Sequence, residues 1–254
     1  MDFWDEEYAA GNLPEDWFFE YDDMDEGFWR ELVAGRVLVI GCGRSTLSEK
    51  LRPLVEKVVS IDSSACSIAD RREENYYFVC DARRIELPDG LSEDGTYDTV
   101  VDKGCLDALL AYREDEEKSA SRAAVAEVRR VLRENGRFVV ITCTREPGED
   151  RDGYGGGHPR AAALLKDAGF GIERREVKAP RPLAPTFADV RPTHYAVVIG
   201  TKVDPHLADY FEYYDSSPEP HDAFASWGVL GGLVRRYLPP TPRILEVGAT
   251  GFRV

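Results

Sequence analysis

The segment Val37-Leu-Val-Ile-Gly-Cys-Gly-Arg-Ser-Thr46 constrains the fold of this 254-residue chain more than any other. Four consecutive apolar residues lead directly into Gly41-Cys-Gly43, and a helical pattern follows. This order predicts a buried strand ending in a tight turn, where glycine is needed because a Cβ would block a close approach or forbid a positive φ. Strand–turn–helix units of this kind bind nucleotide-like cofactors at the carboxyl end of a parallel sheet.

Strand and helix patterns alternate downstream and predict an α/β domain. Strands are expected at residues 36–40, 57–61, 76–80, 97–102, 137–143, 171–178 and 194–202, and helices at 46–54, 63–74, 119–132 and 160–168. Asn135-Gly136 is expected to end the long helix, and residues 145–159 to form a loop. Four prolines between the last two strands exclude a helical crossover, so these strands are expected to pair antiparallel.

Composition narrows the classes of function. A net charge of -15 argues against binding nucleic acid through a broad basic face. The acidity either favours a basic partner or serves only to keep the protein soluble. The first 35 residues interleave acidic with aromatic side chains, so they are expected to pack against the domain rather than form a disordered tail. The four histidines and five cysteines show no metal-ligand spacing, and no disulfide framework is indicated. With no targeting pattern and no apolar run of the ~18 residues that a membrane span needs, a cytoplasmic location is expected.

Acidic residues end three predicted strands, and the carboxyl ends of parallel strands meet at one edge of a sheet. Asp62 lies 21 residues after Gly41, the spacing of an acid that accepts hydrogen bonds from ribose hydroxyls. Asp81-Ala82 is placed to recognise the edge of an adenine, and Asp102-Lys103-Gly104 puts charged groups at the same edge. The structural alternatives are a helix N-cap for Asp62, a turn for Asp81 and a salt-bridged loop for Asp102-Lys103-Gly104. Thr46 stands where a dinucleotide fingerprint has its third glycine, which argues against NAD.

Residues 204–254 weakly repeat the beginning of the chain. Tyr210 and Gly248 lie 207 residues downstream of Phe3 and Gly41, respectively. The repeat predicts one domain over residues 1–203 and the truncated start of a second copy over residues 204–254.

Together these motifs resemble class I S-adenosylmethionine-dependent methyltransferases. The glycine turn, Asp102-Lys-Gly-Cys-Leu-Asp-Ala108, the segment 127–138 and Phe3-Trp-Asp-Glu-Glu-Tyr8 are similar to the members that modify lysines of translation elongation factor 1-alpha. Some of those members carry two methyltransferase domains in tandem. The resemblance implies a three-layer, Rossmann-like fold whose seven-stranded sheet is mostly parallel with an antiparallel last strand.

The resemblance also implies a site for S-adenosyl-L-methionine. It assigns to the cofactor Trp4, Tyr8 and Trp17 as a lid, Gly41 and Gly43 in the turn, Asp62 and Ser63 at the ribose, Asp81 and Ala82 at the adenine, and Lys103 beside it. Asp102 is the hypothesised catalytic residue, an acceptor that orients the attacking amine.

The expected function is transfer of a methyl group from S-adenosylmethionine to a protein lysine, with a basic, lysine-bearing protein surface as the partner. Nucleic acid, membrane and metal are not expected. Three alternatives stay open: a small-molecule methyltransferase, an NAD-dependent oxidoreductase, and a non-catalytic cofactor-binding module.

Overall fold

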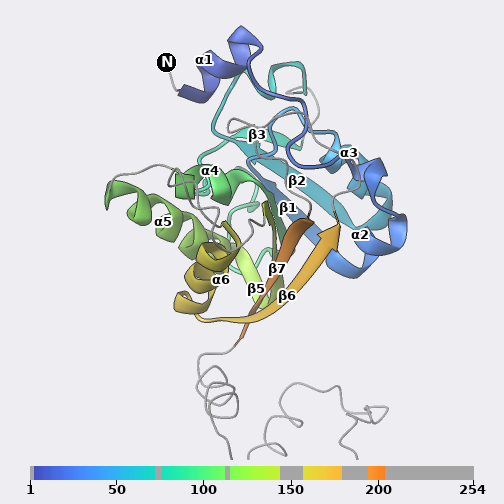
Figure 1. The fold of residues 1–254 in the computed structure, drawn as a ribbon, viewed down its shortest axis with the longest axis vertical. Helices are drawn as coiled ribbons and strands as arrows, with labels where there is room; N and C mark the ends of the chain where they lie inside the picture. The colour runs from blue at the N-terminus through green and yellow to red at the C-terminus, as the bar shows by residue number, and fades with distance from the viewer. Residues whose placement is uncertain (1–2, 72–75, 112–114, 144–156, 179–193, 204–254) are drawn as a thin grey trace, which may run out of the picture. The chain divides into compact units, whose positions relative to one another are not determined.

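A computed structural model describes residues 3–71, 76–111, 115–143, 157–178 and 194–203, all within one compact unit, Met1–Phe211. The predicted second repeat at 204–254 and most of the predicted loop at 145–159 lie outside the described residues. The described strands form one seven-stranded sheet in the order β3-β2-β1-β4-β5-β7-β6 (Figure 1). Their bounds are β1 Arg36–Ile40, β2 Lys57–Asp62, β3 Tyr77–Val79, β4 Tyr97–Lys103, β5 Leu132–Cys143, β6 Phe170–Lys178 and β7 His194–Lys202.

Strand direction follows the prediction. β1 to β5 pair parallel, whereas β7 pairs antiparallel with both β5 and β6. The predicted antiparallel pairing of the last two strands is therefore confirmed. The prolines between these strands predicted it, because a parallel connection between neighbouring strands needs a crossover, usually a helix.

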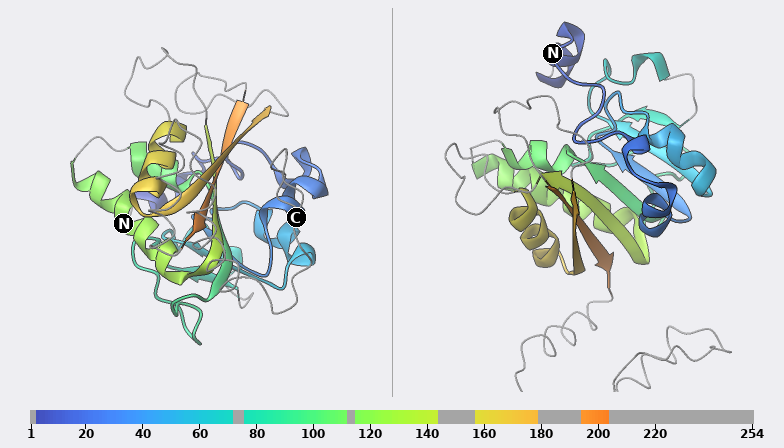
Figure 2. Two further views of the ribbon diagram at one scale, coloured as in Figure 1. Left: turned by 90° about the horizontal axis from the view of Figure 1, so that it is seen from below. Right: turned by 45° about the vertical axis from the view of Figure 1, so that its right-hand side comes forward.

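Helices cover both faces of the sheet. The described helices are α1 Phe3–Ala10, α2 Glu26–Leu32, α3 Leu47–Leu51, α4 Cys105–Ala111, α5 Asp115–Val131 and α6 Gly157–Asp167, with 3-10 turns at Tyr21–Asp23, Arg52–Leu54 and Ala69–Arg71. α4, α5 and α6 lie on one face, and α2 and α3 lie on the other (Figure 2, left).

Two separate hydrophobic cores flank the sheet, because successive strand residues point to opposite faces. Leu38 and Ile40 of β1 pack into the core beneath α4, α5 and α6. Val37 and Val39 of the same strand pack into the core on the α2 and α3 side. This arrangement confirms the predicted three-layer fold.

The aromatic N-terminal segment packs against the domain, as predicted. Trp29 is completely buried, and Phe19 is nearly so. Tyr195 of β7 donates its hydroxyl to the carbonyl of Phe18 at 2.9 Å, which joins the beginning of the chain to the strand next to the β6 edge of the sheet.

The predicted helix over residues 63–74 is wrong for the part that the structure describes. Only the 3-10 turn Ala69–Arg71 forms there. Side chains take the backbone amides that a helix would have used: Asp62 accepts from the Ser64 N–H at 2.8 Å, and Asp5 accepts from the Cys66 N–H at 3.1 Å. Such side-chain bonds compete directly with helix formation.

The long helix also ends earlier than Asn135-Gly136 predicts. α5 stops at Val131, and Leu132 already pairs with Tyr97 of β4. Asn135 takes a left-handed conformation, φ 62°, within β5, where the register between β4 and β5 shifts. The Asn-Gly pair therefore marks an irregular strand rather than a helix end.

Candidate functional site

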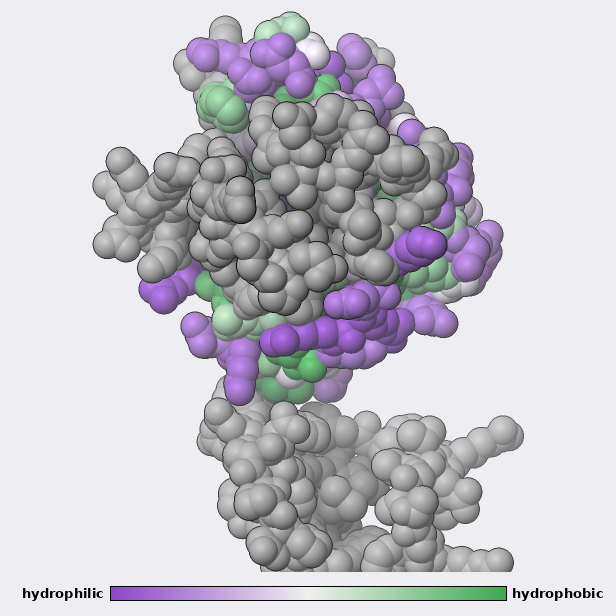
Figure 3. Space-filling view, in the orientation of Figure 1, coloured by the Kyte–Doolittle hydropathy of each residue, from purple (hydrophilic) through white to green (hydrophobic). Residues whose placement is uncertain are grey.

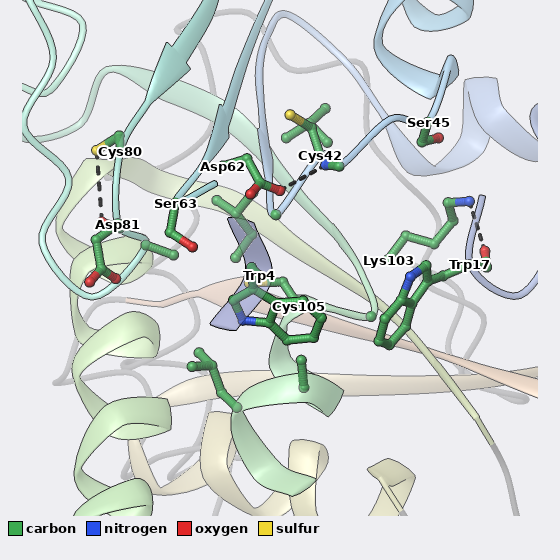
Figure 4. A pocket seen from close by; sticks show the side chains of 18 of the residues that line it. Trp4, Trp17, Cys42, Ser45, Asp62, Ser63, Cys80, Asp81, Lys103 and Cys105 are labelled. Atoms are coloured by element: carbon green, nitrogen blue, oxygen red, sulfur yellow. Dashed lines mark hydrogen bonds between the residues drawn. The ribbon is translucent and has the colours of Figure 1, made fainter. Parts of the chain in front are cut away.

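A cavity of about 330 Å³ lies where β1, β2 and β4 end. This volume is within the range of small-molecule sites, roughly 300–1,000 Å³. All ten residues assigned to the cofactor by resemblance line it: Trp4, Tyr8, Trp17, Gly41, Gly43, Asp62, Ser63, Asp81, Ala82 and Lys103. Asp102 does not. Figure 4 shows Asp81 and Lys103 on opposite sides of the cavity, with Asp62 and Ser63 between them.

Both glycines of the turn after β1 have positive φ, 58° at Gly41 and 52° at Gly43. A Cβ on Gly41 would lie 2.5 Å from the Cβ of Cys105 at the start of α4. A Cβ on Gly43 would lie 2.5 Å from the hydroxyl oxygen of Tyr8 on α1. The turn therefore needs glycine because two other parts of the protein pack directly against its backbone.

Asp62 fixes the shape of the cavity floor at the end of β2. Its Oδ2 accepts from the Gly43 N–H at 2.8 Å, and its Oδ1 accepts from the Ser64 N–H at 2.8 Å. Asp62 lines the cavity beside the exposed Ser63, so the pair presents oxygen acceptors to a ligand with hydroxyl groups.

Asp81 forms a forked ion pair with Arg83, a cavity residue that the sequence did not single out. The Arg83 Nε and Nη2 donate to Asp81 Oδ2 at 2.8 and 2.6 Å. Partial burial raises the pKa of the Asp81 carboxyl, but the bonds from Arg83 outweigh it and hold that pKa below its ordinary value. Asp81 is therefore charged at the end of the cavity where it meets Ala82.

The cavity is covered by α1 and by residues 13–19, which we call the strap. α1 is held by three bonds: Asp5 accepts from the Ser64 hydroxyl at 2.6 Å and the Cys66 N–H at 3.1 Å, and Arg44 donates to the Tyr8 carbonyl at 3.0 Å. The ring of Trp4 on α1 meets that of Trp17 on the strap edge to face, with centroids 6.1 Å apart. Together α1 and the strap form a lid with indole rings toward the cavity (Figure 4).

Lys103 lines the cavity, but its ammonium points to the strap. Nζ donates to the carbonyls of Trp17 and Phe19, each at 2.8 Å, and forms an ion pair with Asp16. Burial lowers the pKa of Lys103, and the nearby Asp16 carboxylate opposes that shift. A buried ammonium without partners would be strongly destabilising, and these three acceptors remove that cost.

Asp102 does not line the cavity, where its hypothesised role of orienting the attacking amine would require it. It is completely buried, and its two oxygens accept from the N–H groups of Cys105 at 2.7 Å and Leu106 at 2.8 Å. The carboxyl thus caps the start of α4. Burial and the neighbouring Asp107 raise the pKa of Asp102 to about 8.

Asp107, on the first turn of α4, is a second buried carboxyl that the sequence did not single out. Its Oδ1 accepts from the Thr142 hydroxyl at 2.6 Å, and its buried Oδ2 has no hydrogen-bond partner among the described residues. Burial raises the pKa of Asp107 to about 6.

Within the described ranges, no group of His, Cys, Asp and Glu could hold a metal ion. Cys42, Cys66, Cys80 and Cys105 are free thiols. None of the helices that the structure describes is long and apolar enough to cross a membrane.

The lining suits a nucleoside that carries a positive charge. Asp62 and Ser63 offer acceptors for ribose hydroxyls, and Asp81 with the Ala82 backbone can recognise a base edge. The indole rings of Trp4 and Trp17 attract cations through their π faces. Such a ligand would therefore find matching chemistry along the cavity.

Comparisons with known proteins agree with this chemistry. The family model described as a methyltransferase domain matches residues 33–165. The mouse protein named eEF1A lysine and N-terminal methyltransferase is 32% identical over 151 residues, which cover 56% of this chain and 21% of that protein. Bovine EEF1A lysine methyltransferase 4 is 32% identical over 160 residues, 56% of this chain and 60% of that protein. The chain thus covers less than two thirds of these relatives.

Solved structures share the fold. A SAM-dependent methyltransferase of Thermotoga maritima superposes with a TM-score of 0.51 at 19% identity, covering 79% of this chain and all of the other. A protein studied for thioacetal formation in echinomycin biosynthesis has a TM-score of 0.55 at 18% identity, covering 85% of this chain and 98% of the other.

The family match decides against the NAD-dependent alternative, as Thr46 had indicated. The chain belongs to the methyltransferase-domain family, and its cofactor is S-adenosyl-L-methionine.

Proposed function

We propose that this methyltransferase modifies the side-chain amine of a protein lysine, on a substrate of the translation elongation factor 1-alpha type. The observation that carries the proposal is that relatives at about 30% identity, in two differently named groups, are named for lysine methylation of eEF1A. The domain that aligns with them also provides a lidded cavity suited to the methyl donor.

The charge of the N-terminal segment supports a basic protein substrate. Residues 3–31 contain eleven acidic side chains and one basic side chain, Arg30. In Figure 3 hydrophilic side chains cover much of the coloured surface around α1, at the top of the view. A surface of one sign attracts an oppositely charged partner and speeds its association. A lysine-rich segment would therefore be drawn to the side of the domain where the cofactor is held.

Several cavity residues then have a role toward the cofactor. Asp62 and Ser63 would hold the ribose, and Asp81 with the Ala82 amide would hold the adenine. The Gly41–Gly43 turn would lie along the methionine portion, beneath Trp4, Tyr8 and Trp17. When bound, S-adenosylmethionine supplies an electrophilic methyl group on a sulfonium.

The protein contributes alignment and exclusion of water rather than acid–base chemistry. A lysine amine attacks only when neutral, whereas its ordinary pKa is about 10.4. The apolar walls of the cavity, among them Val39, Ala108 and Leu109, disfavour the ammonium form because they remove it from water. A lysine that enters this environment therefore gives up its proton more readily.

Labelling tests the proposal directly. The full chain is incubated with radiolabelled S-adenosylmethionine and either a cell lysate or purified elongation factor 1-alpha. We expect one labelled protein band that disappears when the acceptor lysine is changed to arginine, and much weaker label with the Asp62→Ala variant at a low concentration of the methyl donor. Label only in small metabolites would instead identify a small-molecule methyltransferase. Calorimetric binding of S-adenosylhomocysteine without any transfer would identify a non-catalytic module.

The cytoplasm is the location that we propose for this reaction. Free thiols at Cys42, Cys66, Cys80 and Cys105 suit a reducing compartment, and a translation factor would be met there. Imaging of the tagged full chain checks this assignment.

A further inference from the structure

Lys103 and Asp16 join two parts of the molecule that are far apart in the sequence. Lys103 is the last residue of β4, and Asp16 lies in the middle of the strap. Both side chains are largely buried, with exposed fractions of 6% for Lys103 and 12% for Asp16. The same Asp16 oxygen also accepts from the hydroxyl of Ser45, at 2.5 Å, beyond the glycine turn that follows β1. One carboxylate therefore holds the strap to two edges of the cavity.

The ammonium of Lys103 makes its hydrogen bonds to residues of the strap. Its two further bonds go to the carbonyls of Trp17 and Phe19, on both sides of a residue with a left-handed conformation, Phe18 with φ 69°. An ammonium has three N–H donors, and all three have acceptors here. No donor is left to point into the cavity.

The next residue, Gly104, is also shaped by the strap. Its φ is 101°, and a Cβ there would lie 2.9 Å from the Trp17 ring and 3.5 Å from the Phe18 ring. Lys103 thus holds the strap by its backbone while Gly104 makes room for its rings. The Trp17 ring that lines the cavity depends on both contacts.

We propose that Lys103 is a positioning residue: with Asp16 and Ser45 it forms a latch that fixes the Trp17 strap over the cavity. It supports cofactor binding through the strap and not by contact between its ammonium and the cofactor. The latch is independent of which acceptor receives the methyl group, so it goes beyond the proposed lysine specificity.

The test uses the full chain and two variants, Lys103→Met and Asp16→Asn. Calorimetry measures the Kd for S-adenosylhomocysteine, and hydrogen–deuterium exchange of the ligand-free protein follows the amides of residues 13–19. We expect each variant to raise the Kd at least tenfold and to speed exchange in the strap. Because the two side chains act as one unit, the double variant is expected to be no worse than the more severe single variant.

Lys50→Met is the matched control. Lys50 pairs with Asp22 at 3.0 Å, and this pair also joins the N-terminal segment to the domain, but its side chains are 46% and 62% exposed. Exposed ion pairs of this kind contribute little to the stability of the folded protein. The control is therefore expected to keep the Kd within twofold of the wild type and to leave strap exchange unchanged.

Two results would overturn the latch. One is Asp16→Asn with a wild-type Kd and wild-type strap exchange. The other is Lys103→Met with a raised Kd but unchanged strap exchange, which would mean that the ammonium contacts the cofactor directly. If Lys103→Met does not fold, Asp16→Asn decides alone, since its side chain keeps the shape and removes the charge.

Discussion

Asp62 accepts a hydrogen bond from the backbone N–H of Gly43 at 2.8 Å, and this bond ties the end of β2 to the turn after β1. The acid that lines the cavity is thus also the group that shapes the turn. A change at Asp62 is therefore expected to affect both the turn and the binding of a ligand in the cavity.

Asp62→Ala should weaken binding of S-adenosylhomocysteine by about 10–100-fold. Each hydrogen bond to a charged group contributes about 1.5–3 kcal/mol, so the loss of even one ligand contact accounts for tenfold or more. Calorimetry measures the Kd. Asp62→Asn keeps one carbonyl acceptor, so its Kd should lie between those of the wild type and Asp62→Ala. A folded Asp62→Ala variant with the wild-type Kd would contradict the assignment of this residue to the ribose.

Gly43→Ala should destabilise the protein and displace α1. A non-glycine residue at φ 52° costs about 1–2 kcal/mol, and the new Cβ would meet the Tyr8 hydroxyl at 2.5 Å. Tyr8→Phe removes that oxygen, so the double variant should regain the part due to the contact but not the part due to φ. Urea unfolding of the four proteins measures both parts. Strict additivity of the two substitutions would mean that the contact has no energetic effect.

Asp102→Ala should act mainly on stability. The substitution removes both acceptors at the start of α4, and loss of a helix cap costs about 0.5–2 kcal/mol. The free energy of unfolding should fall by that amount, whereas the Kd for S-adenosylhomocysteine stays within a few-fold of the wild type. A variant as stable as the wild type that has lost methyl transfer would favour the original hypothesis, in which Asp102 orients the amine.

Asp102 and Asp107 should make the protein less stable as the pH rises. Their pKa values are raised in the folded state, to about 8 and about 6, above the unfolded value near 3.9. The folded state therefore binds more protons than the unfolded state between pH ~4 and ~8. Their contribution to stability is complete below pH ~4 and is lost as the pH rises toward ~8, with a slope of up to about 1.4 kcal/mol per pH unit for each proton.

Asp107→Asn tests this pH dependence. The substitution removes one titrating group and the charge that raises the pKa of its neighbour Asp102, so the decline in stability from pH 5 to 8 should be shallower than in the wild type. Urea unfolding at constant ionic strength measures the slope. Asp22→Asn, at an exposed carboxyl, serves as the control and should follow the wild-type curve. Parallel curves for wild type and Asp107→Asn would refute the prediction.

Local patterns in the sequence determined where the strands lie along the chain and which edge of the sheet carries the site. The run of apolar residues before Gly41 allows only a buried strand, and the prolines between the last two strands exclude a helix there. Asp62 and Asp81 follow such strands directly, so their common location at the cavity was predictable. The acidic, aromatic beginning of the chain likewise indicated a packed segment.

The tertiary structure alone decided what four of the charged side chains do. Asp5 and Asp62 take the amides that a helix over residues 63–74 would need, Lys103 binds the strap, and Asp102 turns away from the cavity to cap α4. The sequence places Asp62, Asp102 and Lys103 at the correct ends of their strands, since that follows from local periodicity. The partner of a charged group depends instead on long-range packing, which brings Asp16 to Lys103 across 87 positions of the chain.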